Sequence, residues 1–333
     1  MTPTPHDALV KATYSDPARA AAHLASVLPP EVVARLDLSR LEVLPGTYIH
    51  PDLAESSSDL LYSVGLRSGG SLLVYLLFEH QSSVDRLMAL RLVLYAARVL
   101  DRWWSEHPEA VVVPPILPLV LYHGERTWTV GRSLSDAWGL DPEDQAALAG
   151  RGLELSYQLH DLSEHSDASL RSRALDALDL LVQLLLKHGR DEDLMDQLDR
   201  WADVWRAVAD GPGLRAIAQV LSYIGIVAGR RSPLERVQRF LVQTLGPRGE
   251  EAFMPWQEQI EARGEARGEA RGEARGVREG QRRTFLSLLR QRFGAISSAV
   301  EARVAAASTD ELTAWTEGFF AASSPEQLLG LSG

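Results

Sequence analysis

Three polar residues flank two apolar runs of the sequence, and together they could bind a divalent cation. Asp59 stands directly before the run 60–66, and Glu79 and Gln81 follow the run 72–78. Mg²⁺ prefers oxygen ligands, keeps several of its waters and needs only one or two protein carboxylates. Acidic residues are also common at strand ends, so this spacing alone favours a solvated turn over a metal site. The elements around the three residues therefore decide what they can do.

The two apolar runs are typical of a β-hairpin. They are joined by Arg67–Gly70, a short connection that contains two glycines. The second run is apolar at every position, which is typical of a central strand covered on both faces. Residues 84–105 have helical periodicity and lead into a further apolar run, Ile116–Tyr122. A helix between two buried strands predicts a crossover connection.

The rest of the chain is predicted to be mainly helical. Residues 7–36 form an opening helical layer interrupted at two prolines, and a strand is expected at 153–160. Helices follow at about 170–209 and 214–226. The predicted fold class is α/β, a central mixed sheet flanked by helices, followed by a helical C-terminal region. The predicted domains are a core at 1–165, a helical domain at 166–256, a linker or helix at 257–280 and a small helical domain at 281–333.

The segment Glu261–Gly276 consists of four perfect copies of Glu-Ala-Arg-Gly. In a helix this period sets like charges four residues apart, where they repel, and each glycine costs about 1 kcal/mol relative to alanine. An isolated helix there would be weak, and a solvated linker is the simpler interpretation. Two such segments side by side could instead pair a glutamate stripe with an arginine stripe, which would make this a helical oligomerisation element.

A series of short segments along the chain forms a joint pattern. In order, the segments are His6–Lys11, Ser58–Tyr62, Tyr75–Ser82, then Met88, Arg91 and Tyr95, and finally Leu117–Gly124. Together they resemble the recombination-promoting nuclease (transposase-like) family of the PD-(D/E)XK superfamily across about residues 6–165. The region from Arg278 to the end is similar to a short C-terminal domain of unknown function that accompanies some of these proteins.

This resemblance implies a PD-(D/E)XK core that cuts DNA with Mg²⁺, or with Mn²⁺ in its place. Asp59 matches the family's metal-binding aspartate and Glu79 its second acidic ligand, while Gln81 occupies the place of the superfamily lysine. A bound cation would polarise the phosphate and lower the pKa of a water, which Gln81 would position. Glutamine offers only hydrogen bonds where lysine offers a positive charge, so this substitution bears on catalytic strength.

Further residues are candidates for contacts with DNA. Lys11 matches the family's N-terminal segment, and Arg91, Arg98 and Arg102 share one face of the predicted helix 84–105. His123 follows the run 116–122 at the presumed active edge and could contact a phosphate or act as an acid. Each has a structural alternative: an exposed lysine, a charged solvent face, and a turn histidine satisfied by backbone.

Composition limits the classes of function. The formal net charge of −11 argues mildly against nucleic acid as a partner, although local clusters of basic residues decide contact. The sequence has no cysteine, no secretory signal and no apolar stretch long enough to cross a membrane, so a cytoplasmic location is expected. The first hypothesis is a DNA endonuclease. The alternatives are a nuclease-like scaffold that binds DNA or a protein without cutting, and a protein that chiefly forms homo-oligomers through its C-terminal region.

Overall fold

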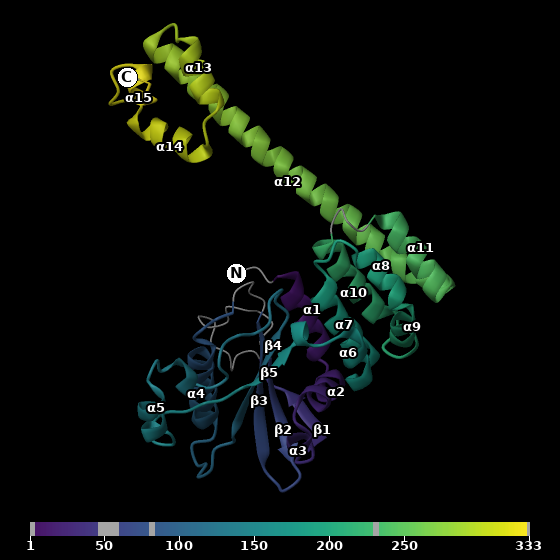
Figure 1. Ribbon diagram of the computed structural model, residues 1–333. Coiled ribbons are helices and arrows are strands. Elements are labelled where there is room, and N and C mark those ends of the chain that lie inside the picture. Colours follow the sequence, from purple (N-terminus) through teal and green to yellow (C-terminus); the bar gives the residue numbers. More distant parts are fainter. Residues whose placement is uncertain (1–3, 46–59, 80–83, 229–232, 332–333) are drawn as a thin grey trace. The chain divides into compact units, whose positions relative to one another are not determined.

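A five-stranded sheet lies at the centre of the larger of two compact units, which comprise Met1–Gln257 and Glu258–Gly333 (Figure 1). The computed structural model describes residues 4–45, 60–79, 84–228 and 233–331. The strands follow one another in sheet order as in sequence, and they are β1 Leu36–Val43, β2 Leu60–Leu66, β3 Ser71–Glu79, β4 Ile116–Tyr122 and β5 Gln158–Asp161.

The sheet is mixed, which confirms the predicted fold class. β1, β2 and β3 pair antiparallel, whereas β3, β4 and β5 pair parallel. β2 and β3 form the expected hairpin, and its turn contains Gly69 and Gly70 at φ of 96° and 83°, a conformation that favours glycine. The crossover between β3 and β4 contains helix α4, Met88–Glu106, as the apolar pattern predicted.

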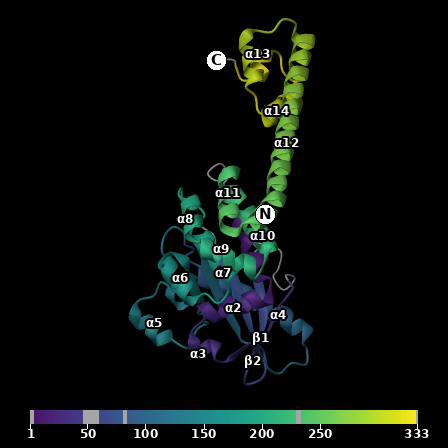
Figure 2. The same cartoon turned by 90° about the vertical axis from the view of Figure 1, so that its right-hand side faces the viewer.

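Helices cover both faces of the sheet (Figures 1 and 2). Helix α4 covers one face. The other face is covered by α1 Pro5–Tyr14, α2 Pro17–Val27 and α7 Ala177–His188. The remaining helices of this unit are α3 Pro30–Val33, α5 Pro142–Leu148, α6 Asp167–Arg173, α8 Leu194–Arg200, α9 Ala202–Asp210, α10 Leu214–Val227 and α11 Leu234–Leu245, with short 3-10 helices η2 Ser135–Ala137 and η3 Leu162–Glu164.

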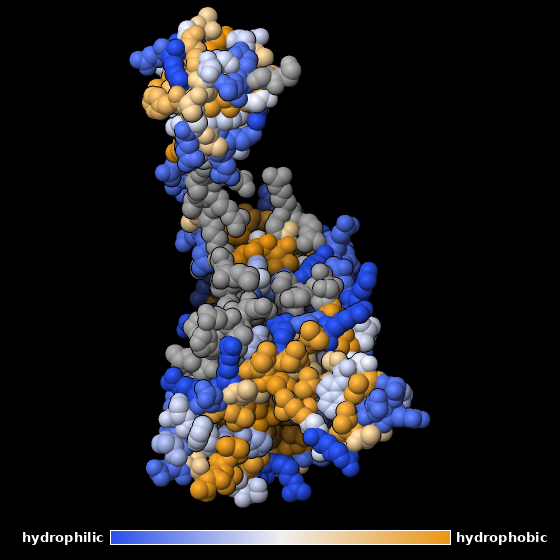
Figure 3. Space-filling view, turned by 90° about the vertical axis from the view of Figure 1, so that its left-hand side faces the viewer, coloured by the Kyte–Doolittle hydropathy of each residue, from blue (hydrophilic) through white to orange (hydrophobic). Residues whose placement is uncertain are grey.

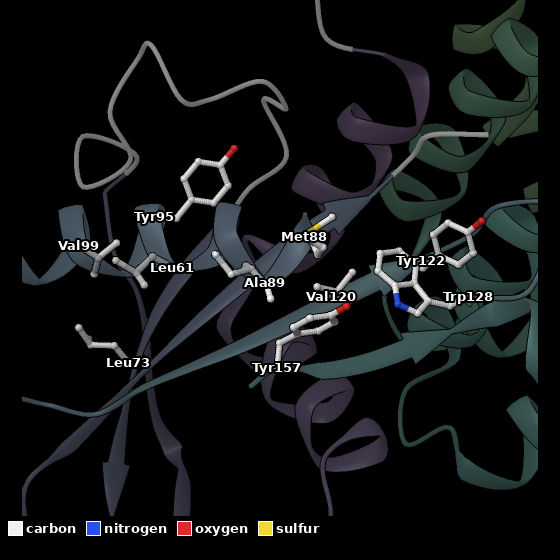
Figure 4. Packing of buried hydrophobic residues seen from close by; sticks show 11 residues of the cluster. Leu61, Leu73, Met88, Ala89, Tyr95, Val99, Val120, Tyr122, Trp128 and Tyr157 are labelled. Carbon is white, nitrogen blue, oxygen red and sulfur yellow. The ribbon is translucent and has the colours of Figure 1, made fainter. Parts of the chain in front are cut away.

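The alternation of strand side chains explains why apolar runs were needed in the central strands. On the α4 side, Leu73 and Val120 join one cluster of buried residues with Leu92 (Figure 4). On the other side, Tyr62 is buried and donates a hydrogen bond to the Tyr14 carbonyl of α1 at 2.9 Å. Both faces of the sheet are therefore packed, and its strands have little room for polar side chains except at their ends.

Local sequence fixes where the helices over the sheet begin. Thr4 and Asp7 form a capping box at the start of α1, where each side chain accepts from the other's backbone N–H. Asp16 caps α2 and Asp176 caps α7 through bonds to free backbone N–H groups. These caps set the ends of the helices that face the sheet.

One boundary of the predicted opening layer was wrong. Residues 7–36 were expected to be helical, but helix α3 ends at Val33 and Leu36 already begins β1. The alternation of apolar and polar residues in β1 is broken by a register shift between Asp37 and Glu42. This irregularity hides the edge strand in the sequence, because a bulge moves the later side chains to the other phase.

The second unit is a small helical domain with its own core. Helix α12, Pro247–Phe293, runs through Pro255 and the repeat into this unit, so Glu261–Gly276 is helical. Its later part packs against α13 Ser298–Ala305, α14 Thr309–Gly318 and α15 Pro325–Leu328. Its core contains Phe285, Leu289, Val300, Val304, Leu312 and Trp315.

Residues 166–257 belong to the same compact unit as the sheet, and the finer division near residue 165 stays a prediction. Among the helices of the described ranges, none is long and apolar enough to cross a membrane.

Candidate functional site

The carboxyl ends of the parallel strands meet at one edge of the sheet. Glu79, the last residue of β3, is paired with Tyr122 of β4, and Tyr122 is paired with Asp161 of β5. On the other side of β3, Leu60 begins β2 at the same edge and lies opposite Leu76. In open α/β sheets this edge is where ligands are usually bound.

The predicted catalytic residues are close in sequence to the strand ends that form this edge. Asp59 directly precedes Leu60, and Gln81 comes two residues after Glu79, but both lie outside the described residues. Glu79 is described through its backbone only. Within the described ranges, no three His, Cys, Asp or Glu side chains are grouped as ligands for a metal ion. The roles of Asp59, Glu79 and Gln81 therefore remain predictions.

His123 is held in a buried position directly after β4. Its side chain is buried, and its Nδ1 lies 3.2 Å from the Leu186 carbonyl oxygen of α7. Its ring centroid lies 4.8 Å from that of His6 on α1. The residue also lines a cavity of about 410 Å³, together with Leu162, Ser163, Lys187 and His188, among others. A role for His123 in binding phosphate remains a prediction, and the structure gives it a packing role as well.

The turn after β4 explains the glycine of the segment Leu117–Gly124. A Cβ at Gly124 would lie 1.9 Å from the Tyr122 hydroxyl oxygen, so a larger residue would collide with the ring. The same hydroxyl donates a 2.9 Å hydrogen bond to the Arg126 carbonyl. Buried Asp161 accepts from the backbone N–H groups of Trp128 and Ser163, each at 2.8 Å. These contacts fix the loops beside the edge.

A buried polar network, which the sequence analysis missed, joins the sheet to three helices. Asp179 of α7 is fully buried and accepts from the Tyr14 hydroxyl at 2.7 Å and from His23 Nδ1 at 2.9 Å. Gln183, one turn further along α7, donates to Asp179 at 2.9 Å and is 2.8 Å from His160 Nε2 on β5. We call Tyr14, His23, His160, Asp179 and Gln183 the polar network.

The ionised carboxylate of Asp179 can only accept hydrogen bonds, and this fixes the donor and acceptor of each bond in the polar network. Although burial raises the pKa of Asp179, the His23 ring and the hydrogen bonds from His23, Tyr14 and Gln183 outweigh it and lower that pKa. Because the Gln183 amide nitrogen donates to Asp179, its oxygen faces His160, which must carry its proton on Nε2. Burial, and next the repulsion of His23, lower the pKa of His160 to about 3. The network therefore holds an ionised carboxylate and a neutral imidazole.

The sequence contained one indication of this network, a pair of polar residues in an otherwise apolar helical segment. Asp179 and Gln183 are separated by four residues in the segment Leu178–Leu186, so they lie on one face of α7. The partners of Asp179 come from residues 14 and 23. No local spacing connects such distant positions, and the network could therefore be found only from the fold.

His160 is expected to make folding stability depend on pH. Its ordinary pKa of 6.5 in the unfolded chain falls to about 3 when folded, so its contribution is fully present above pH 6.5. As the pH falls from 6.5 towards 3, only the unfolded chain takes up the proton, and the free energy of unfolding decreases by about 1.4 kcal/mol per pH unit. Urea denaturation at several pH values measures this slope.

The matched variant for that experiment is His160→Gln, which keeps a side-chain donor but does not titrate. It should flatten the slope between pH 6.5 and 4, whereas exposed His107→Gln should leave it unchanged. An identical slope in the native protein and in His160→Gln would show that this ring does not control the pH dependence.

The candidate DNA-contact residues occupy different surroundings. Arg98 is exposed on α4, whereas exposed Arg102 pairs with Glu106 at 2.6 Å and half-buried Arg91 pairs with Asp85 at 3.0 Å. Lys11 is exposed on α1. The structure thus brings Arg98 and Arg102 together on one helix, one turn apart, while Lys11 lies on the layer across the sheet.

The outward face of α4 also carries apolar side chains. Leu87, Leu90 and Leu94 are 51%, 40% and 48% exposed, and Trp104 is 62% exposed. The face on the side of α4 and α5 carries a broad apolar area bordered by hydrophilic residues (Figure 3). The arginines of α4 therefore lie beside an apolar surface and are not part of a continuous basic field.

The protein is an α/β protein whose mixed sheet brings the carboxyl ends of β3 and β4 together at one edge. Residues 4–212 match the family model described as "Putative transposase, YhgA-like", and the chain belongs to this family. No solved structure matches the chain significantly.

Curated relatives include active and inactive proteins by name. "Recombination-promoting nuclease RpnD" of Escherichia coli O157:H7 is 29% identical over 264 residues, which are 78% of this chain and 95% of that protein. "Inactive recombination-promoting nuclease-like protein RpnE" of Escherichia coli strain K12 is 30% identical over 267 residues, 77% of this chain and 86% of its own length. "Recombination-promoting nuclease RpnA" of strain K12 is 32% identical over 202 residues, covering 60% and 65% of the two chains.

Proposed function

We propose that this chain is a cytoplasmic, Mg²⁺-dependent DNA endonuclease that hydrolyses phosphodiester bonds in recombination or as part of a mobile element. The observation that carries the proposal is the register at the carboxyl edge. Leu60, the neighbour of Asp59, lies opposite Leu76, so Glu79 is only three residues, about 10 Å, further along β3. Relatives named as nucleases support the same activity.

The residues proposed for the site have the right chemistry for Mg²⁺ or Mn²⁺. Asp59 and Glu79 would supply carboxylate oxygens, and Mg²⁺ is usually bound through one or two protein carboxylates. The two residues adjoin the edge at which β2 begins and β3 ends. When bound, the cation would polarise the phosphate and lower the pKa of a water. Gln81 would hold that water through its amide, which hydrogen-bonds without adding charge.

Cleavage of supercoiled plasmid tests the proposal directly. The native protein should convert supercoiled DNA to nicked and linear forms in Mg²⁺ and leave it intact in EDTA. Cleavage that persists at the same rate in EDTA would reject the metal-dependent mechanism.

Arg98 and Arg102 are expected to bind the DNA backbone. Each Arg→Ala variant should weaken binding to a labelled duplex and reduce the slope of log K against log[salt] by about 1, because one phosphate contact is lost. The effect should be larger for Arg98, since Glu106 already occupies Arg102. Fluorescence anisotropy at several salt concentrations in EDTA measures both quantities.

The control for this measurement is Arg151→Ala, which removes an exposed arginine that bonds only to nearby backbone carbonyls. Its affinity and salt slope should match those of the native protein. Unchanged slopes for both α4 variants would place the DNA on another surface.

A second candidate function is a nuclease-like scaffold that binds DNA or a protein without cutting. Two observations favour it: Gln81 stands where the superfamily has lysine, and the relative RpnE is named inactive although it is as similar as the nucleases. Titration with Mn²⁺ separates the two candidates. Stoichiometric binding that is lost in Asp59→Ala supports the nuclease, whereas a scaffold has no need of an intact metal site.

A further inference from the structure

The Glu-Ala-Arg-Gly repeat is part of helix α12, and the charged side chains that the structure describes in it are exposed. Glu261, Glu265, Glu269 and Glu273 are all exposed, as is Arg275. Residues four apart in a helix are neighbours, so each glutamate stands beside another glutamate and each arginine beside another arginine. Within a single helix this arrangement is unfavourable, because the repeat places like charges together along its whole length.

The glycines of the repeat are not required by the fold of one chain. A Cβ at Gly272 or Gly276 would meet no atom within 4 Å, and neither residue has a positive φ. Glycine destabilises a helix relative to alanine. The surroundings of Gly272 and Gly276 would therefore accept alanine, and the fold of one chain does not require glycine there.

Helix geometry sorts the repeat into four rows. Each residue turns the helix by about 100°, so a four-residue period turns it by about 400° and every row advances by only about 40° per repeat. Glutamate and arginine are two residues apart, about 200°, and their rows run along opposite sides. The glycine row and the alanine row lie between them, and each is flanked by glutamate on one side and arginine on the other.

These rows restrict how two copies can pair. Setting the glutamate row of one helix directly against the arginine row of another uses two different surfaces, and such contacts do not close into a dimer by themselves. Pairing through the glycine row uses the same surface on both copies. In an antiparallel two-fold pair, glutamate then lies beside glutamate and arginine beside arginine. In a parallel pair, glutamate of each copy lies beside arginine of the other on both flanks.

We propose that Glu261–Gly276 of two copies of this chain pair side by side in parallel, with the glutamate row of each helix beside the arginine row of the other. The repulsion within each row is then offset by attraction across the pair. This proposal concerns assembly and does not depend on nuclease activity.

The charged rows of the two helices can attract each other only if the helix axes are close together. The two flanking rows lie about 100° from the glycine row, too far to the side to meet across helices held apart by large side chains. A row without Cβ atoms lets the helix axes approach, as at small-residue contacts between helices elsewhere. Rows of period four pack at a crossing angle of about −50°, so contact is concentrated near the middle of the repeat, around Gly268 and Gly272.

Single cysteines test the orientation, because the native chain contains none. In the parallel pair a residue of the glycine row faces its own copy near the crossing point. Gly268→Cys and Gly272→Cys should therefore each form disulfide-linked dimers under mild oxidation. Ala270→Cys lies on the opposite row and serves as the matched control, with at least about tenfold less cross-linked product.

Two results would overturn the orientation. If differently tagged Gly268→Cys and Gly272→Cys chains link to each other rather than to themselves, the pair is antiparallel about residue 270. If Ala270→Cys links as efficiently as the glycine variants, or if none of the three links, the glycine row is not the interface.

Charge exchange tests the electrostatic part of the proposal. Replacing all four glutamates by arginine (E261R, E265R, E269R and E273R) should raise the dimer dissociation constant at least about tenfold, as measured by analytical ultracentrifugation at low salt. Exchanging every glutamate with every arginine of the repeat should restore dimerisation, because the rows remain complementary. Circular dichroism checks that all variants keep the helix.

Equal dimerisation of the four-arginine variant and the native chain, or no restoration in the exchanged variant, would reject the pairing of charge rows. Plasmid cleavage is not used in either experiment, so failure here is distinguishable from failure of the nuclease proposal.

Discussion

Asp59→Ala and Glu79→Ala are each expected to abolish Mg²⁺-dependent plasmid nicking, with the rate falling at least about 100-fold. The reason is that a catalytic cation contributes several kcal/mol of charge stabilisation, and each 1.4 kcal/mol is about tenfold in rate. Removing one of two carboxylates should release the ion at ordinary Mg²⁺ concentrations. Initial rates of conversion of supercoiled plasmid, measured across a range of Mg²⁺, report both the loss and any rescue by excess metal.

Glu109→Ala is the matched control, because Glu109 is an exposed glutamate in the loop after α4. It should retain the native rate. Gln81→Lys restores the superfamily residue and should preserve or increase the rate if Gln81 stands beside the attacking water. Nicking that is equally fast in Asp59→Ala, Glu79→Ala and the native protein would assign the activity to a contaminant or another site.

Asp179→Ala is expected to lower the free energy of unfolding by about 3–5 kcal/mol, because it removes one partner of a buried ionic network and leaves His23 and Tyr14 without an acceptor. Tyr14→Phe removes a single hydrogen bond to the carboxylate and should cost about 2 kcal/mol. Urea denaturation followed by tryptophan fluorescence measures both, since every tryptophan except Trp315 lies within residues 1–257.

Asp203→Ala is the control for Asp179. Asp203 pairs with Arg171 at 2.6 Å, but its side chain is 65% exposed, and such a pair contributes at most about 1 kcal/mol. If Asp179→Ala were no more destabilising than Asp203→Ala, the polar network would not be a stabilising element of the fold.

The pKa of Asp179 gives this network a second signature. Because that pKa is lowered on folding, the stabilisation is present above the ordinary carboxyl value and is lost as the pH falls through the folded value. Asp179→Asn should therefore remove part of the acid sensitivity below about pH 4.

Much of the fold could be predicted because its central elements are strongly patterned. The uninterrupted apolar run of β3, the two glycines of the hairpin and the helix before β4 each pointed to the structure observed. β1 was missed because its register shift breaks the alternation that identifies a strand. Local patterns identify regular elements and fail where the backbone is irregular.

The roles of Asp59 and Glu79 stay predictions, because Asp59 lies outside the described residues and Glu79 is described through its backbone only. The structure describes the start of β2 and the end of β3, where Leu60 pairs with Leu76. Asp179 lies far from this series and has partners on α1, α2 and α7. Its importance arises from tertiary packing, which propensity and spacing do not contain.

The hydrogen bond between Tyr14 and Asp179 joins residues 165 positions apart. During synthesis at about 5–20 residues per second, α1 leaves the ribosome roughly ten to thirty seconds before α7 exists to receive it. During that interval the face of α1 that packs against α7 has no partner. The larger unit therefore cannot be completed until α7 has been synthesised.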